Sequence, residues 1–241
     1  MQYIIKMETP NNLKFKAIVK GILYRKYNLP NSLLSIKCIL KKETFNICKE
    51  NEDGRINSCT DEIEIIKILE DKMPGRIIRP GKRMWYDILV YDYQYDWLPV
   101  NIKSTRTSTS DNTGNLAMCV WAYTDEKLDL RKKNTYKNGD MSKILIDKLK
   151  KKKYNYNNTK DYYFVVVNKV NPNDIIVNSI KGLTILSSNN NNLPFQVCWN
   201  KNRKFTYKNI IKNIEMLLNA LQKPKPSWKE SFLNDVRKIT L

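Results

Sequence analysis

The chain has 241 residues, of which 43 are Lys or Arg and 24 are Asp or Glu, so its formal net charge at pH 7 is +19. The absence of histidine excludes every mechanism in which imidazole serves as base, nucleophile or metal ligand. An AT-rich genome would by itself inflate the lysine content, but the excess of basic over acidic residues favours nucleic acid as the partner.

Several other kinds of site are excluded by motif. Five cysteines form no CxxC pair, so neither a zinc ribbon nor a disulfide framework is expected, and the seven glycines form no nucleotide-binding loop. The sequence shows no signal peptide and no apolar run of the roughly 18 residues needed to cross a bilayer. We therefore expect a soluble, cytoplasmic protein with no membrane partner, in which carboxylates, amides, lysine and a metal carry any hydrolytic chemistry.

The first third of the chain is expected to be helical. Apolar residues recur at helical spacing over Leu29–Asn51, and a second helix is expected over Thr60–Met73, with acidic residues in its first turn. Two apolar segments, Trp85–Tyr91 and Trp97–Ile102, flank a short polar stretch and predict an antiparallel hairpin that turns near Gln94.

The rest of the chain mixes helices and strands. Helices are expected at Asn115–Thr124, Met141–Lys150 (capped by Asp140), Tyr207–Leu221, and beyond a capping box at Ser227 and Glu230. β-Branched and aromatic residues predict strands at Tyr162–Val167, Ile175–Val177 and Leu183–Leu186, and loops are expected at Ser104–Gly114 and Asn189–Asn192. This order predicts an α/β fold with a mixed central β-sheet flanked by helices.

The predicted hairpin brings an acid, an amide and an amine to one place. Asp87 on the first strand falls opposite the end of the second strand that carries Asn101 and Lys103. Asn101 and Lys103 share a face because strand side chains alternate. Asp92 and Asp96 lie at the turn instead, too far along the strand to belong to the same site.

These residues resemble the signature of PD-(D/E)xK nucleases, in which a strand Asp and a hairpin are followed by a hydrophobic residue and (D/E)-x-Lys. Asp87 with Asn101, Ile102 and Lys103 is similar to the Asn variant of that motif. The resemblance implies a restriction-endonuclease-like core. Asn101 replaces the second metal-binding carboxylate of the family, which leaves the number of bound metals open, and Tyr86 replaces the usual proline.

A further acid is expected from the helix before the hairpin, where some members of the family place a Glu. Glu62 lies one turn before the apolar residues Ile65 and Ile66, so it points inward more than Glu64 does. The alternative is that both acids only complement the helix dipole.

The resemblance implies Mg²⁺ as the cofactor, with Asp87, Asn101 and Glu62 as its ligands. A bound metal lowers the pKa of a water ligand and neutralises charge that develops on the phosphate oxygens. Lys103, the fourth expected catalytic residue, would orient that water or help to deprotonate it. The alternative is that the Asp…Asn-x-Lys pattern arises by chance in a chain rich in Lys and Asn.

Further segments between about Met84 and Lys204 resemble a group of type II restriction endonucleases. They are Asn101 to Thr105, Ser110 to Asn112, Ala122 to Thr124, and Asn191 to Trp199. On this resemblance we expect a single nuclease domain over 1–241. It comprises a helical N-terminal part at 1–80, a catalytic core at 81–186, and a DNA-contacting loop with C-terminal helices at 187–241.

Polar side chains near the expected cleft are candidates for DNA contact. Arg106, Asp111 and Asn112 follow Lys103 closely and are expected to contact phosphate or to hold the catalytic hairpin. Amides suit adenine, and Arg or Lys suits guanine. Side chains of these types occur at Asn191, Asn192, Gln196, Asn200, Lys201 and Arg203. The alternatives are that Asn189–Asn192 is a low-complexity surface loop and that Lys150–Lys153 is a solvated helix end.

The expected function is Mg²⁺-dependent, site-specific cleavage of double-stranded DNA by a type II restriction endonuclease. Cleavage of a two-fold symmetric site implies a homodimer, and the family implies a cognate DNA methyltransferase that protects the host. Two alternatives stay open. One is a structure-specific repair or junction nuclease of the same fold, and the other is an inactive DNA-binding module in which Asn101 marks a decayed site.

Overall fold

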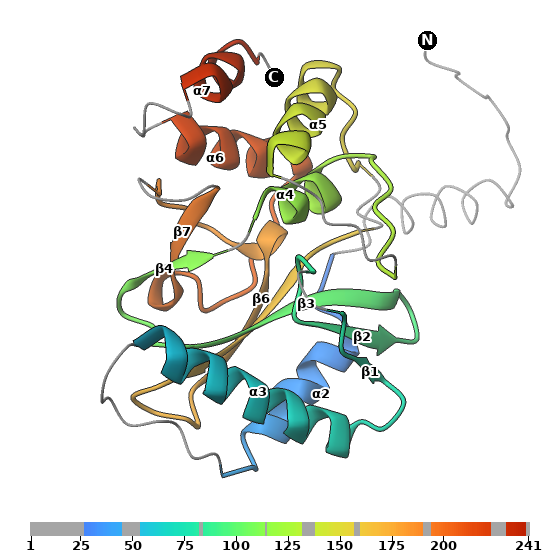
Figure 1. Ribbon diagram of the computed structural model, residues 1–241, viewed down its shortest axis with the longest axis vertical. Helices are drawn as coiled ribbons and strands as arrows, with labels where there is room; N and C mark the ends of the chain where they lie inside the picture. Colours follow the sequence, from blue (N-terminus) through green and yellow to red (C-terminus); the bar gives the residue numbers. More distant parts are fainter. Residues whose placement is uncertain are drawn as a thin grey trace, which may run out of the picture.

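A five-stranded mixed sheet forms the centre of the molecule (Figure 1). The computed structural model describes residues 27–44, 54–81, 84–113, 115–131, 138–156, 160–189, 194–222 and 230–239. In sheet order the strands are β1 (Ile77–Ile78), β2 (Ile88–Asp92), β3 (Asp96–Thr105), β5 (Tyr163–Asn168) and β6 (Ile175–Ser179). The expected α/β fold, with a mixed sheet flanked by helices, is confirmed.

β3 lies in the middle of this sheet and is paired along both edges. It runs antiparallel to β2 and parallel to β5, with Asn101 opposite Phe164. The predicted hairpin is confirmed, because Asp92 pairs with Asp96 and residues 93–95 form the turn. β1 and β6 complete the sheet as antiparallel outer strands.

Helices cover both faces of the sheet, which explains why its central strands are apolar on both sides. α2 (Asn31–Leu40) and α3 (Gly54–Lys72) pack on one face, around a core that includes Val100 and Ile102. The other face packs against α4 (Leu116–Tyr123), α5 (Asn138–Lys150), α6 (Ile210–Gln222) and α7 (Glu230–Arg237). Figure 1 shows these layers below and above the sheet. None of the described helices is both long and apolar enough to cross a membrane.

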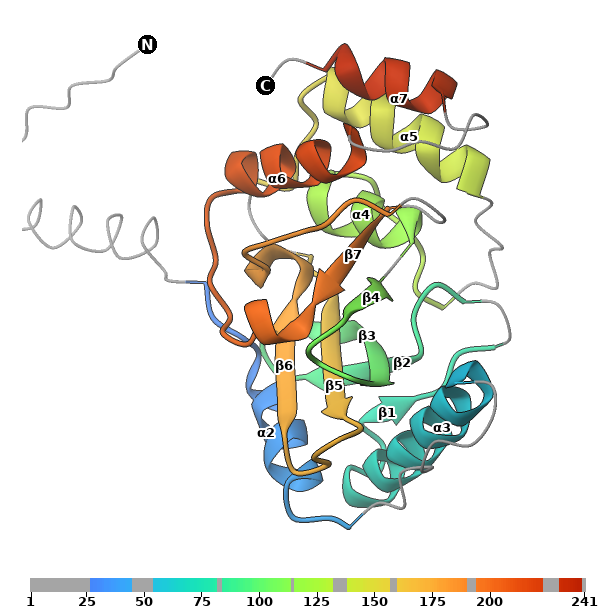
Figure 2. The ribbon, with the colours of Figure 1, turned by 90° about the vertical axis from the view of Figure 1, so that its left-hand side faces the viewer.

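A second, two-stranded sheet lies beside the first and faces the viewer in Figure 2. It consists of β4 (Ser110–Thr113) and β7 (Phe195–Cys198), which pair antiparallel. β4 falls inside the segment Ser104–Gly114, so the prediction of a loop throughout that segment was wrong. Its polar residues carry no strand pattern of their own, and the strand forms because β7, far away in sequence, supplies the hydrogen-bonding edge.

The predicted strand at Leu183–Leu186 was also wrong. A 3₁₀ turn at Ile180–Gly182 precedes it, and the Asn202 side chain occupies the backbone groups that a neighbouring strand would use. Asn202 Oδ1 accepts the N–H groups of Thr184 at 2.8 Å and Ile185 at 3.1 Å, and its Nδ2 donates to the Ile185 carbonyl at 3.0 Å.

Several helix boundaries differ from the expected ones. α2 ends at Leu40, short of the predicted Asn51, and α3 already begins at Gly54. α5 begins at Asn138, which places Asp140 in its first turn and not at its cap. The helix expected at Asn115–Thr124 is confirmed as α4, and Asn115 is its N-cap, because Asn115 Oδ1 accepts the Met118 N–H at 2.9 Å. The capping residue predicted at 227 lies outside the described residues.

Candidate functional site

Asp87 and Asn101 lie side by side at the open end of the β2–β3 hairpin. The Asp87 N–H donates to the Val100 carbonyl at 3.0 Å, and Asp87 Oδ2 accepts the Ile102 N–H at 2.8 Å. The paired part of the two strands ends at Ile88 and Val100, and these two bonds hold Asp87, the residue before β2, at the Asn101 end of β3, where the sequence predicted it.

The Asp87 carboxylate is buried, and its neighbours oppose the effect of that burial. Burial raises the pKa of Asp87, while the Ile102 N–H, the charge of Lys103 and a hydrogen bond from the Asn101 side chain act to lower it. The Oδ1 atom of Asn101 is buried and has no hydrogen-bond partner among the described residues. A buried oxygen of this kind is costly without a donor and is a suitable ligand for a hard cation.

Glu62 reaches the same site from α3. Asp61, its neighbour in sequence, accepts the Ser104 hydroxyl at 2.8 Å and pairs with Lys169 at 3.6 Å, which anchors this turn of α3 on the carboxyl end of β3. Because Asp61 and Glu62 are adjacent, the anchor holds Glu62 close to Lys103.

Electrostatic coupling joins Glu62 to the hairpin residues. Burial raises the pKa of Glu62 to about 7; the charge of Lys103 opposes this increase, and the carboxylates of Asp87 and Asp111 add to it. Glu62 comes from α3, Lys103 from β3 and Asp111 from β4, and Asp87 immediately precedes β2. The structure therefore brings together all four catalytic residues expected from the sequence, with Asp111 as an additional neighbour.

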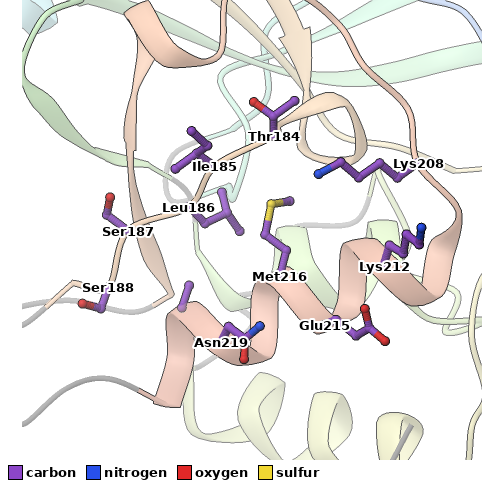
Figure 3. A pocket seen from close by; sticks show the side chains of 11 residues that line it. Thr184, Ile185, Leu186, Ser187, Ser188, Lys208, Lys212, Glu215, Met216 and Asn219 are labelled. Atoms are coloured by element: carbon purple, nitrogen blue, oxygen red, sulfur yellow. The ribbon is translucent and has the colours of Figure 1, made fainter.

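A cavity of about 330 Å³ opens beside these groups, lined by both Glu62 and Asp87. Its other walls are Cys59, Ile63, Ile66, Arg79, Pro80, Gly81, Met84 and Tyr86. A larger cavity of about 620 Å³ lies elsewhere, between α6 and the segment Thr184 to Ser188 (Figure 3). It contains none of the four expected catalytic side chains.

The oxygen atoms present fit a magnesium ion that keeps part of its water shell. Asp87 and Glu62 share a cavity, and Asn101 Oδ1 accepts no hydrogen bond from any residue that the structure describes. Among the described residues no three His, Cys, Asp or Glu side chains cluster closely enough to hold a metal. A cation here would thus rely on one or two carboxylates, a neutral oxygen and water, which is the usual coordination of protein-bound Mg²⁺.

Asp111 and Asn112 occupy opposite faces of β4. Asp111 is the cross-strand neighbour of the buried Val197, and its Oδ2 accepts the indole N–H of Trp199 at 3.3 Å. Burial raises the pKa of Asp111 and Lys103 opposes the increase, so this carboxylate lies on the side of the catalytic groups. Asn112 is exposed on the outer face.

The remaining expected DNA contacts are dispersed. Arg106, Asn200 and Lys201 are exposed, and the Asn200 N–H donates to the Thr107 carbonyl at 2.9 Å. Arg203 is paired with Asp174 and also donates to Asn200 Oδ1 at 3.0 Å, so it is already engaged within the protein. Asn191 and Asn192 lie outside the described residues.

Two residues of the site were missed by sequence reasoning. Tyr162 is buried beside Asn101, and its hydroxyl donates to the carbonyl of Trp85, two residues before Asp87, at 2.9 Å. Trp199 packs on Phe164 at 5.3 Å between ring centroids and holds Asp111. Alternation along Tyr162–Val167 could have placed Tyr162 on the Asn101 side, but no local signal marks Trp199.

Comparisons with known proteins do not extend this description. No protein-family model matches the chain, and no curated protein matches it. The residues and their arrangement therefore carry the evidence for function.

Proposed function

We propose that the chain is a Mg²⁺-dependent endonuclease of the PD-(D/E)xK type that cuts double-stranded DNA at a short recognition sequence, as type II restriction endonucleases do. The observation that carries the proposal is the convergence of Asp87, Asn101 and Lys103 with Glu62 at the carboxyl end of β3. Three of these residues come from one hairpin and the fourth comes from a helix anchored on it.

The roles follow from the chemistry of each group. Asp87, Glu62 and the unpartnered Oδ1 of Asn101 supply oxygen ligands for Mg²⁺. When bound, the ion lowers the pKa of a coordinated water and neutralises charge on the scissile phosphate. Lys103 orients the attacking water and places a positive charge beside the phosphate as negative charge accumulates.

The partners of the proposed enzyme follow from its reaction. Cutting both strands of a two-fold symmetric site calls for two active sites, so the enzyme acts as a homodimer. A DNA methyltransferase of the same system would modify the recognition sequence in host DNA. The net charge of +19 supports binding to the phosphate backbone.

The first experiment incubates the purified protein with unmethylated plasmid in Mg²⁺ and, separately, in EDTA. Discrete fragments in Mg²⁺ alone are expected from the wild type and from Asp147→Asn, an exposed carboxylate variant on α5. Asp87→Asn and Lys103→Met should stop cleavage while DNA binding persists.

Two outcomes contradict the proposal in different ways. Cleavage retained by Asp87→Asn would show that the assigned site is wrong. Binding of several unrelated DNAs without any cleavage would point to a binding module in which Asn101 is the lesion, and cutting of branched DNA alone would point to a junction nuclease.

A further inference from the structure

The outer face of the β4–β7 sheet holds two amide side chains in register. Asn112 on β4 is the cross-strand partner of Gln196 on β7. The backbone N–H and C=O of Gln196 both bond to Ser187, at 2.8 and 3.0 Å, so they point away from β4. Asn112 and Gln196 therefore form a non-hydrogen-bonded pair, the type in which opposing side chains approach most closely.

Hydrogen bonds fix the orientation of the Asn112 and Gln196 amide groups. Asn112 Oδ1 accepts Nε2 of Gln196 at 2.9 Å and Nδ2 of Asn189 at 2.9 Å. An amide oxygen has two lone pairs, so both are used. The polar atoms that remain include the donor Asn112 Nδ2 and the acceptor Gln196 Oε1, and neither atom has a hydrogen-bond partner within the described part of the chain.

A donor and an acceptor on two cross-strand neighbours complement the major-groove edge of adenine. Adenine presents an N7 acceptor and an N6 donor there, whereas guanine presents two acceptors, O6 and N7. Guanine would set its O6 against Gln196 Oε1 and leave both oxygens without a donor. The width of the major groove also admits a two-stranded β-ribbon.

The position of the ribbon agrees with a role next to the scissile bond. Asp111, on the inner face of β4, acts electrostatically on Glu62 and is acted on by Lys103. The outward amide of Asn112 is the next residue along the same short strand. The exposed Arg106 lies just before this strand, in the segment that joins it to β3, where it can contact phosphate.

We propose that Asn112 and Gln196 together read one adenine in the major groove, so that the recognition sequence contains an A·T pair contacted by the β4–β7 ribbon. The inference rests on the proposed function in taking duplex DNA as the substrate. It goes further in naming the base, the groove and the two atoms that read it.

The test uses plasmid fragments synthesised with 7-deazaadenine or, as the matched control, with 7-deazaguanine. Each analogue replaces the purine N7 acceptor by C–H and keeps Watson–Crick pairing. We expect the full-length protein to bind 7-deazaadenine DNA about 10- to 100-fold more weakly than unmodified DNA, measured in EDTA, because one half of a bidentate contact is lost. Binding to 7-deazaguanine DNA should change much less, and cleavage in Mg²⁺ should follow the same order.

Variants test the two side chains directly. Asn112→Ala, which removes the donor to N7, should bind unmodified and 7-deazaadenine DNA alike, and Gln196→Ala should weaken binding to both DNAs. Asn219→Ala, which removes an exposed amide on α6, should discriminate as the wild type does. Equal binding of unmodified and 7-deazaadenine DNA by the wild type overturns the inference, and so does an equal loss on both analogues. Neither result contradicts the nuclease proposal if the unmodified and modified DNAs are cut in Mg²⁺.

Two further outcomes separate the base-reading inference from the nuclease proposal. Selective loss of binding to 7-deazaadenine DNA by a protein that cuts no DNA supports the inference and overturns the nuclease proposal. Failure to bind any DNA overturns both.

Discussion

Glu62 is a carboxylate held where burial disfavours its charge. Its pKa is raised from 4.5 to about 7. Between these values the folded state binds more protons than the unfolded state, so the contribution of Glu62 to stability is present below pH 4.5 and is lost as the pH rises through 7. At neutral pH the ionised side chain therefore lowers the stability of the fold, as functional groups often do.

The variant Glu62→Gln tests this electrostatic cost. In EDTA at pH 8 it should be more stable than the wild type by about 1–3 kcal/mol, after allowance for partial solvent screening of the carboxylate. The difference should shrink as the pH falls below 7 and vanish near pH 4.5. Urea unfolding at a series of pH values measures it, and a difference that does not vary with pH would contradict the assignment.

Lys181 is a buried cation whose charge stabilises the buried carboxylate of Asp161. Its ammonium donates to the Lys160 carbonyl at 2.7 Å and acts on Asp161, which also accepts the Tyr27 hydroxyl at 2.6 Å. Burial lowers the pKa of Lys181 to about 8, and the charge of Asp161 opposes this decrease.

Removing one member of this pair should cost far more than removing both. Lys181→Met leaves a buried carboxylate without its cation, and we expect a loss of about 3–5 kcal/mol in the free energy of unfolding. The double variant Lys181→Met with Asp161→Asn should recover part of the loss. Denaturant unfolding of the wild type, both single variants and the double variant measures the coupling; additive losses would show that the two charges do not interact.

Sequence reasoning brought the four expected catalytic residues together because local rules govern their positions. Strand alternation and one hairpin turn bring Asp87 to Asn101 and Lys103, and helical spacing turns Glu62 inward. The sequence did not show which faces of a strand Asp111 and Asn112 occupy, because side-chain alternation can be applied only to a segment that is recognised as a strand. Asp111 was expected to touch phosphate or to hold the hairpin, and its inner position beside Trp199 follows from pairing with β7.

At the scale of elements, α4 is tied to the hairpin through its cap. Asn115 Oδ1 accepts the Met118 N–H at 2.9 Å, while its Nδ2 donates to the Trp85 carbonyl at 2.9 Å. Trp85 lies two residues before Asp87. One amide thus starts a helix and fixes the chain that leads into the catalytic strand.

Substitutions at this position separate the two bonds. Asn115→Asp keeps the capping acceptor and loses the donor to Trp85, whereas Asn115→Ala loses both. We expect the Ala variant to lose about 1–2 kcal/mol of stability and the Asp variant to lose less. Thermal unfolding checks the order, and a larger loss in the Asp variant would contradict it.

Whether a helix or strand can be predicted from the sequence depends on how much of its stability comes from residues close in sequence. The helix at α4 and the strands β2, β3 and β5 carry capping residues or apolar runs of their own. β4 carries neither, and the segment Leu183–Leu186 carries strand-like residues yet is held by the side chain of Asn202. Both errors arise from partners that are distant in sequence.

At the scale of the whole molecule, the charge of +19 should dominate the affinity for non-specific DNA. If the protein contacts six to ten phosphates, raising the salt concentration from about 50 to about 200 mM should lower its affinity for DNA by about 10³- to 10⁵-fold. Fluorescence anisotropy on a mixed-sequence duplex in EDTA gives the slope of log affinity against log salt. A slope near zero would mean that the excess charge does not face DNA.

The central position of β3 also has a consequence for the order in which the molecule opens. Its residues Asn101, Ile102 and Lys103 pair with β5 along one edge, and on the other edge the Ile102 N–H donates to the Asp87 carboxylate. Their amides should therefore exchange with solvent deuterium only through global unfolding, whereas the small β4–β7 sheet can open by local fluctuation. In the proposed nuclease, a restrained β3 beside a looser β4–β7 sheet would allow the small sheet to search the bases of DNA while the proposed hydrolytic groups keep their places.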